Sequence, residues 1–253
     1  MEDDKAPRPN GFTTCFLKVC WEIIKIDLHK MVLKSQCFNR IGGSTNSSLL
    51  ALLPKEKEVA SFDWFRPISL CNIGYKVITK IIANRLKKLL PKLIPDNQGG
   101  FIKGRKIWDN IILVQEAIHS SVGNREKGMV VKLDLANAFD RVRHASLFQV
   151  MEHFGFDSLF TRWAKAYIIG PWIALIVNGR VTPFFQASWC LRQGFPLSPL
   201  FFFLVVERLS LLIGRVRREG LLSGVKLFVE QIITYLLFTD VLLFGSGSLT
   251  DWL

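Results

Sequence analysis

Two aspartates close to one predicted strand could support metal chemistry. Asp134 ends the apolar run GMVVKLDL, and Asp140 follows after the segment LANAF, which we expect to begin a helix. An aspartate at the end of a strand is a common ligand for a hard divalent cation, because the strand fixes it while water still reaches it. Aspartates at strand-to-helix junctions are more often helix caps, so the segment alone leaves both interpretations open.

A third aspartate, Asp240, stands between the two apolar runs of LLFTDVLLF. The pattern predicts a tight strand-turn-strand hairpin with the carboxylate exposed at its tip. An acid at the turn of a buried hairpin serves either a ligand or solvation. The hairpin therefore remains compatible with a metal site and with a plain solvated turn.

The segment LRQGFPLSP lies between these carboxylates in sequence. Gly194 and Pro196 would fix a backbone platform, from which Arg192 and Gln193 would project polar groups. A long apolar helix is expected to begin near Leu200. As a bare pattern, the segment is only a loop followed by a helix start.

The elements that position these segments follow from hydrophobic periodicity. Helical spacing predicts helices over residues 11–34, 75–90 and 107–120, and two further helices between 140 and 170. The helix over 75–90 carries lysines on the face opposite its apolar stripe. That basic face either follows a nucleic-acid backbone or is simply solvated.

Strand and turn signals dominate other parts of the chain. GMVVKLDL has the β-branched composition of a buried strand. Asn178-Gly179, between WIALIV and RVTPFFQ, predicts a two-residue hairpin turn because both positions accept positive φ. We place a boundary between two subdomains near residue 125, within the turn-forming stretch GNREKG.

Composition limits the classes of function. The formal net charge of +12 over 253 residues favours polyanionic partners, either nucleic acid or an acidic membrane surface. The two longest apolar runs, 196–214 and 226–244, carry charges near their centres, which cost about 2.5 to 3.5 kcal/mol each in a bilayer. We therefore expect a buried helix and a buried strand pair, and no membrane span.

The cysteine content and the first residues of the chain favour an intracellular location. Five cysteines without a C-x-x-C pair favour a reduced intracellular compartment, and the acidic, proline-containing start lacks the profile of a secretory signal. Nuclear and cytoplasmic locations both remain open.

Taken together and in order, the segments resemble one family. KLDLANAFD, RQGFPLSP and LLFTDVLLF, with KAPRPNGF, FRPISLCN, YKVITKIIANRL and QGGFIKGR, are similar to the reverse transcriptase domain of plant LINE-type (non-LTR) retrotransposons. The resemblance covers nearly the whole chain. It implies an α+β fold with the fingers and palm of a right-hand polymerase, an antiparallel palm sheet packed on helices, and an absent thumb. Residues 1–125 would be finger-like and 126–253 palm-like, truncated after the third palm motif.

The resemblance also implies a mechanism and its site residues. Such enzymes copy an RNA template from a DNA primer, using deoxynucleoside triphosphates and two Mg²⁺ ions. Asp134 would bridge both ions, and Asp240 would be a further ligand. Phe139 matches the steric gate against a ribose 2′-hydroxyl, Arg66 would contact the triphosphate, and Gln193 and Gly194 would support the template base and the nucleotide. Asp140 matches a position of structural rather than metal-binding role.

One departure from the family pattern bears on activity. The family reads FADD at the hairpin tip, whereas this chain reads FTDV, so only Asp134 and Asp240 remain of three carboxylates. Two Mg²⁺ ions about 4 Å apart repel by roughly 17 kcal/mol at an effective dielectric of about 20, and anionic ligands must offset that repulsion. We expect impaired metal binding and little polymerase activity. The alternative is a non-catalytic, basic nucleic-acid-binding remnant.

Overall fold

The computed structural model divides into two compact units, each discontinuous in sequence. Unit 1 comprises residues 1–86 and 139–202, and unit 2 comprises residues 87–138 and 203–253. The division into a finger-like and a palm-like part near residue 125 stays a prediction. The structure describes residues 11–43, 45–58, 61–100, 102, 104–123, 128–227, 231–237 and 241–246.

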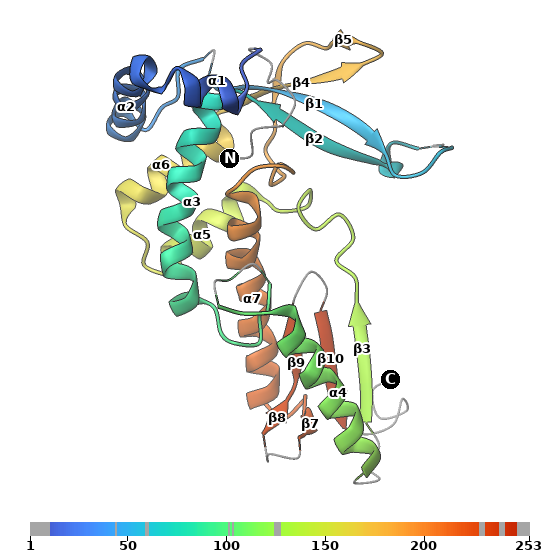
Figure 1. The fold of residues 1–253 in the computed structure, drawn as a ribbon. Helices are drawn as coiled ribbons and strands as arrows, with labels where there is room; N and C mark the ends of the chain where they lie inside the picture. The colour runs from blue at the N-terminus through green and yellow to red at the C-terminus, as the bar shows by residue number, and fades with distance from the viewer. Residues whose placement is uncertain are drawn as a thin grey trace. The chain divides into compact units, whose positions relative to one another are not determined.

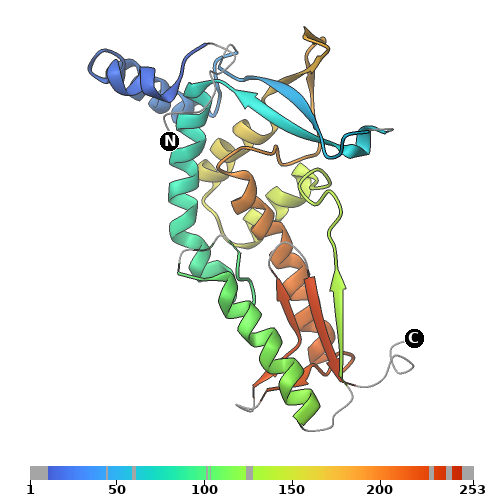
Figure 2. The ribbon, with the colours of Figure 1, turned by 45° about the vertical axis from the view of Figure 1, so that its right-hand side comes forward.

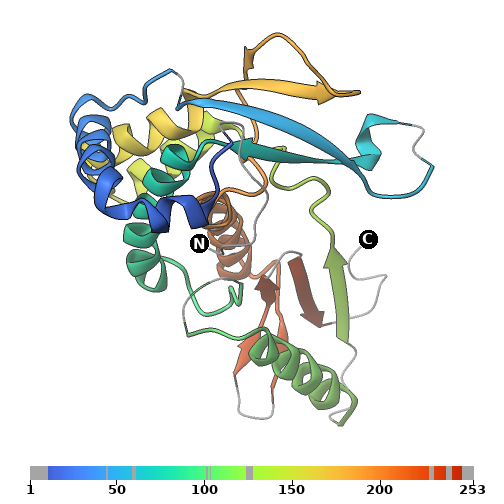
Figure 3. The same ribbon diagram turned by 45° about the horizontal axis from the view of Figure 1, so that its top comes forward.

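The sheet of unit 1 has five strands in the order β2-β1-β4-β5, and β6 also pairs with β4. β1 lies between an antiparallel partner, β2, and a parallel partner, β4 (Figure 3). Asn178 and Gly179 have φ values of 49° and 77°, which confirms the predicted turn between β4 and β5. The elements are β1 (Ser47–Pro54), the 3-10 helix η1 (Phe62–Trp64), β2 (Phe65–Cys71), β4 (Trp172–Val177), β5 (Arg180–Val181) and β6 (Phe185–Gln186).

The first helical region of unit 1 differs from its prediction. The single helix expected over residues 11–34 is two helices, because the backbone leaves helical geometry at Cys20, whose φ and ψ are −88° and 14°. The hydroxyl of Thr13 caps the first of them by accepting from the amide of Phe16 at 3.2 Å. The two helices are α1 (Thr14–Val19) and α2 (Trp21–Phe38).

The remaining helices include two that contribute residues to both units, α3 (Ile73–Leu93) and α7 (Ser198–Arg218) (Figure 1). α3 was expected to end near Pro91, but it ends at Leu93. Pro91 lies inside the last turn of α3, which continues for two residues beyond it although proline donates no backbone hydrogen bond. The two helices predicted between residues 140 and 170 are confirmed as α5 (His144–His153) and α6 (Ser158–Ile169).

Unit 1 has an aromatic core that its sequence spreads over distant helices. Tyr75 from α3 and Trp163 and Tyr167 from α6 are each at most 1% exposed. The rings of Tyr75 and Tyr167 lie 5.5 Å apart, and the indole of Trp163 donates to the hydroxyl of Ser35 at 3.2 Å. These contacts fix α2, α3 and α6 against one another.

Unit 2 contains an antiparallel sheet packed on a helix. Its three strands have the order β3-β10-β9, and β7 and β8 form a separate pair. Leu242 and Phe244 from β10 share one hydrophobic cluster with Leu113 and Ala117 from α4. The helix α4 lies alongside this sheet (Figure 2). This arrangement confirms the expected α+β class. The elements are α4 (Ile107–Gly123), β3 (Gly128–Leu133), β7 (Val225–Lys226), β8 (Ile232–Ile233), β9 (Tyr235–Leu237) and β10 (Val241–Ser246).

The two long apolar runs are a helix and strands, as expected. The first forms most of α7, in which every residue from Leu200 to Leu204 is buried. The second provides β8, β9 and most of β10. Within the part of the chain that the structure describes, no helix is long and apolar enough to cross a membrane.

Glu207 on α7 gives the first testable prediction, on the pH dependence of stability. It is 4% exposed, and burial raises the pKa of its carboxyl to about 7. The folded state therefore holds this proton more tightly than the unfolded state, and folding stability falls as pH rises from about 4.5 to 7. Glu207→Gln should remove this fall, so its melting temperature should exceed that of the parent chain at pH 8 by several degrees.

The control for this measurement is Glu152→Gln, which changes an exposed carboxylate on α5. Thermal melts of the three proteins at pH 5 and pH 8 provide the comparison. A Glu207→Gln curve that tracks the parent chain at both pH values would exclude a pH-dependent cost of burying Glu207.

Candidate active site

The strand β3 delivers Asp134 to the end of the antiparallel sheet of unit 2. β3 ends at Leu133, which pairs with Val241, and Asp134 is the exposed residue that follows. Val241 also pairs with Leu237 across the β9–β10 hairpin, which confirms the predicted strand-turn-strand. Asp240, which lies between the two strands in sequence, is outside the described residues.

Val241 directly follows Asp240, whereas the family pattern has a second aspartate after the first, so one residue is missing here. Val241 is 1% exposed and is flanked by Leu133 on β3 and Leu237 on β9. This position therefore contributes an apolar side chain to the packing of the sheet. Among the residues that the structure describes, which exclude Asp240, no group of three or more His, Cys, Asp and Glu side chains is placed to hold a metal.

The segment that follows Asp134 forms turns, so the expectation that LANAF begins a helix is wrong. Asn137 adopts the left-handed conformation with φ of 51°, and the amide of Ala138 donates to the carbonyl of Leu135 at 3.1 Å. Asparagine tolerates this conformation because its short polar side chain bonds locally. The next helix, α5, begins only at His144.

Phe139 is half-buried and packs against α7. Its ring stacks on that of Phe202 with centroids 4.7 Å apart and an interplanar angle of 26°. Its carbonyl accepts from the amide of Leu191 at 2.8 Å. Both contacts are internal to unit 1, and they hold the proposed steric gate in one position next to the LRQGFPLSP segment.

The backbone of Gln193 and Gly194 forms a tight turn that is fixed from two sides. The carbonyl of Gln193 accepts from the amide of Ser69 on β2 at 3.3 Å, and the hydroxyl of Ser198 donates to the carbonyl of Arg192 at 2.6 Å. Gly194 has φ of 91°, a conformation that strains any residue with a β-carbon. The predicted backbone platform is therefore present, and glycine is required by its conformation.

Arg192 does not project from this platform, contrary to the sequence-based expectation. It is 8% exposed, and its guanidinium donates to the hydroxyls of Ser48 and Tyr75 at 3.3 and 3.2 Å and to the carbonyl of Tyr167 at 3.1 Å. It also lies over the ring of Phe195 at 4.7 Å. Arg192 thus joins β1, α3 and α6 to the turn at Gln193.

No local sequence pattern distinguishes this arginine from an exposed one. Its hydrogen-bond partners lie 144, 117 and 25 residues away in the chain, so only the tertiary fold brings them together. Burial raises the pKa of the neighbouring Tyr75 hydroxyl, and the guanidinium of Arg192 offsets only part of that rise.

Arg66 is exposed on β2, where it pairs in register with Leu53 of β1. Alternation along the strand places its side chain on the face opposite Pro67 and Ser69. Arg66, Phe139, Gln193 and Gly194 all belong to unit 1, whereas Asp134 belongs to unit 2. Within unit 1, the amide of Ser69 on the strand of Arg66 contacts Gln193, and the backbone of Leu191 links this turn to Phe139.

The chain is similar in sequence to a described protein family and to proteins of two transposable elements. The family described as reverse transcriptase (RNA-dependent DNA polymerase) matches residues 53–250. A 149 kDa uncharacterized protein of transposon TX1 from Xenopus laevis is 28% identical over 221 residues, which are 87% of this chain and 17% of that protein. A retrovirus-related Pol polyprotein of the R2 retrotransposable element from Popillia japonica is 30% identical over 198 residues, 76% of this chain and 26% of that protein.

A solved structure shares the fold at low sequence identity. Apo telomerase from Candida tropicalis superposes with a TM-score of 0.55 at 12% identity, covering 93% of this chain and 45% of that one. The chain spans about a sixth to a quarter of the length of the two transposon proteins above. Because the family match covers most of the sequence, this chain belongs to the reverse transcriptase family.

Proposed function

We propose that this chain is the finger-like (1–125) and palm-like (126–253) part of a reverse transcriptase from a plant LINE-type, non-LTR retrotransposon, with little or no polymerase activity of its own. The whole protein would synthesise DNA on an RNA template inside the cell, from a DNA primer and deoxynucleoside triphosphates. The observation that carries the activity statement is that Asp240 is followed directly by the buried Val241, without the second aspartate of the family pattern.

The proposed metal ligands are Asp134 and Asp240. Leu133 and Val241 pair across β3 and β10, and Asp134 and Asp240 are their immediate neighbours in the sequence. The donor chemistry fits Mg²⁺, which is commonly held by one or two carboxylates together with substrate phosphates. Bound metal would stabilise the charge on the attacking and leaving oxygens of nucleotide transfer. With two carboxylates in place of three, affinity for a pair of ions should be weak.

The proposed nucleotide contacts come from unit 1. The exposed guanidinium of Arg66 suits a triphosphate because its planar donors match phosphate oxygens. Phe139, held by Phe202 and Leu191, would exclude a 2′-hydroxyl by contact. The turn of Gln193 and Gly194 would present backbone and amide groups to the template base and the sugar.

Primer extension on an RNA template tests the proposal directly. The parent chain should show little or no primer extension with Mg²⁺, because the site for two Mg²⁺ ions lacks one anionic ligand. Mn²⁺ should raise any residual activity only weakly. Robust extension that disappears in Asp134→Ala would show that two carboxylates suffice and would overturn the inactive assignment.

A further inference from the structure

The last turns of α7 expose a mixed basic and apolar surface within unit 2. Its apolar side chains are between 38% and 76% exposed, and its two arginines are exposed as well. Exposed apolar side chains that gather in one place commonly mark an interaction site. The surface, named the α7 face, consists of Arg208, Leu211, Leu212, Arg215, Val216 and Leu221.

Helix geometry orders the side chains of the α7 face. Arg208 and Arg215 are seven residues apart, which is close to two turns, so they lie in one line along the helix. Residues three and four positions apart are neighbours on either side of such a line. Leu211 therefore flanks the arginines on one side, and Leu212 and Val216 flank them on the other. The α7 face has positive charge along its middle and apolar side chains at both edges.

The opposite side of the same turns is part of the core. Val206, Ser210 and Ile213 recur at helical spacing and are 7%, 3% and 8% exposed. Because this buried side fixes the rotation of the helix, the α7 face points outward from unit 2. A partner would therefore meet a rigid surface.

The cap of α7 holds Leu221 in place next to the helix. The amide of Leu221 donates to the carbonyl of Val216 at 3.1 Å, and the amide of Gly220 donates to the carbonyl of Arg217 at 3.0 Å. Gly220 has φ of 77°, and the three features together form a Schellman motif. In this motif the residue after the glycine packs back onto the last turns of the helix. Leu222, which follows, is 8% exposed and anchors the segment inside unit 2.

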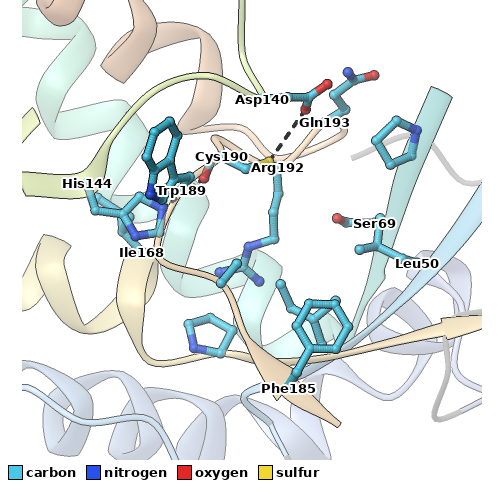
Figure 4. A pocket seen from close by; sticks show the side chains of 14 residues that line it. Leu50, Ser69, Asp140, His144, Ile168, Phe185, Trp189, Cys190, Arg192 and Gln193 are labelled. Carbon is cyan, nitrogen blue, oxygen red and sulfur yellow. Dashed lines mark hydrogen bonds between the residues drawn. The ribbon is translucent and has the colours of Figure 1, made fainter. Parts of the chain in front are cut away.

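The arginines of the α7 face differ from an arginine that serves the fold. Arg192 points into the interior of unit 1 and is 8% exposed (Figure 4). The side chain of Arg215 is 70% exposed and pairs with Glu219 one turn further along the helix, at 2.8 Å. Arg208 has no ion pair among the residues that the structure describes. Both guanidinium groups are thus accessible to a partner.

Stabilisation of the helix dipole explains only part of this surface. Cations in the last turn of a helix are favourable, which accounts for the arginines at 215, 217 and 218. The effect is lost beyond that turn, and Arg208 lies about ten residues before the helix end. Charge at a helix end also gives no reason for three apolar side chains exposed beside the arginines.

The arrangement of charge and apolar groups selects the kind of partner. A guanidinium binds a carboxylate with two parallel hydrogen bonds, and leucine side chains pack against other apolar side chains. An amphipathic helix offers both kinds of group on one side. A nucleic-acid backbone has no apolar groups to cover the leucines. A membrane would need apolar side chains at the middle of the surface, where α7 has arginines.

We propose that the α7 face binds an amphipathic helix of a separate protein, with acidic residues along its middle and leucine-like residues at both edges. The carboxylates would pair with Arg208 and Arg215, and the apolar residues would cover Leu211, Leu212 and Val216. The net charge of +12 on the chain would speed the approach of an acidic partner. The α7 face shares no residue with the proposed metal ligands or nucleotide contacts, so the interaction is independent of polymerase activity.

Fluorescence anisotropy with a designed peptide and the full chain tests the proposal. The labelled probe is a helical peptide of about five turns, with glutamates two turns apart and leucines at the flanking positions. Binding should have a Kd on the order of 100 µM or tighter, because interfaces of this small size are weak. The same peptide with lysines in place of the glutamates should bind at least tenfold more weakly. Absence of binding by the glutamate peptide would overturn the proposal.

A charge exchange locates the binding site. The double variant Arg208→Glu with Arg215→Glu should bind the glutamate peptide at least tenfold more weakly than the parent chain does. It should prefer the lysine peptide, and this reversal also shows that the variant is folded. Arg162→Glu with Arg180→Glu, at exposed positions of unit 1, has the same net charge and should bind as the parent chain does. Equal loss of binding in both double variants would show only an effect of net charge and would contradict a site on α7.

The apolar contribution is measured with Leu212→Ser. This change should weaken peptide binding about tenfold, whereas Leu159→Ser, at a 62% exposed position of α6, should leave it unchanged. Parent-like peptide binding by Leu212→Ser would reduce the α7 face to a general polyanion site and would overturn the proposal.

Two further probes in the same buffer distinguish the other classes of partner. They are vesicles of phosphatidylserine and phosphatidylcholine, and a short single-stranded RNA. Vesicle binding that is lost in Leu212→Ser, without peptide binding by the parent chain, would assign the α7 face to a membrane surface instead. RNA binding that is lost in the arginine double variant, again without peptide binding, would assign it to nucleic acid. Peptide binding that depends on Arg208, Arg215 and Leu212 together supports the proposal.

Discussion

Insertion of one aspartate directly after Asp240 should raise primer extension by the chain on the order of 10³-fold. The insertion restores two adjacent aspartates at the tip of the β9–β10 hairpin. A further anionic ligand offsets part of the repulsion between the two Mg²⁺ ions, and metal ligation contributes several kcal/mol of transition-state stabilisation. About 4 kcal/mol corresponds to that change in rate. Incorporation of deoxynucleotides on an RNA template is the measurement.

Two controls separate charge from chain length in this experiment. Insertion of alanine at the same place lengthens the loop between Leu237 and Val241 without adding a carboxylate, and it should leave activity low. Asp134→Ala in the aspartate-insertion background should abolish the gained activity. Equal gains from alanine and aspartate would show that loop length limits the parent chain, and that the absent carboxylate does not.

Arg192→Met should lower the free energy of unfolding by about 2 to 4 kcal/mol. The substitution removes the donors to Ser48, Tyr75 and Tyr167, and loss of a partner costs a buried polar group about 1 to 3 kcal/mol. Tyr75 retains its own bond to the carbonyl of Tyr167, and burial of a cation is relieved, so the sum stays below the full loss of three bonds. Chemical denaturation measures the change.

Arg192→Lys tests whether charge or geometry matters at this position. An ammonium group cannot reach the partners on β1, α3 and α6 with the planar fork of a guanidinium, so we expect a loss almost as large as that of Arg192→Met. Arg180→Met, at an exposed position next to the β4–β5 turn, is the matched control and should change stability little. Parent-like stability of Arg192→Met would contradict the role of Arg192 as a link between elements.

The sequence determined most of the local structure in this chain. The long helices, the Asn178-Gly179 turn and the β9–β10 hairpin all follow from periodicity and turn chemistry, which act over a few residues. The predicted helix start at LANAF was wrong because Asn137 adopts a left-handed conformation, which residue type permits but does not require. The break at Cys20 likewise has no strong local signal.

Family membership was also readable from sequence, because it depends on the order and spacing of motifs. The sequence alone shows that FTDV lacks one carboxylate. It does not show the environment of Val241, the residue that follows Asp240. Val241 pairs with Leu133 and Leu237 and is 1% exposed, and an acid at such a buried position would need a ligand to be stable.

Only the tertiary structure decided the surroundings of Arg192. Ser48, Tyr75 and Tyr167 meet Arg192 across separations of 25 to 144 residues. Local patterns carry no information on such contacts, because burial depends on how whole elements pack. The carboxylates at positions 134 and 240 could therefore be proposed from sequence, whereas the partners of Arg192 could not.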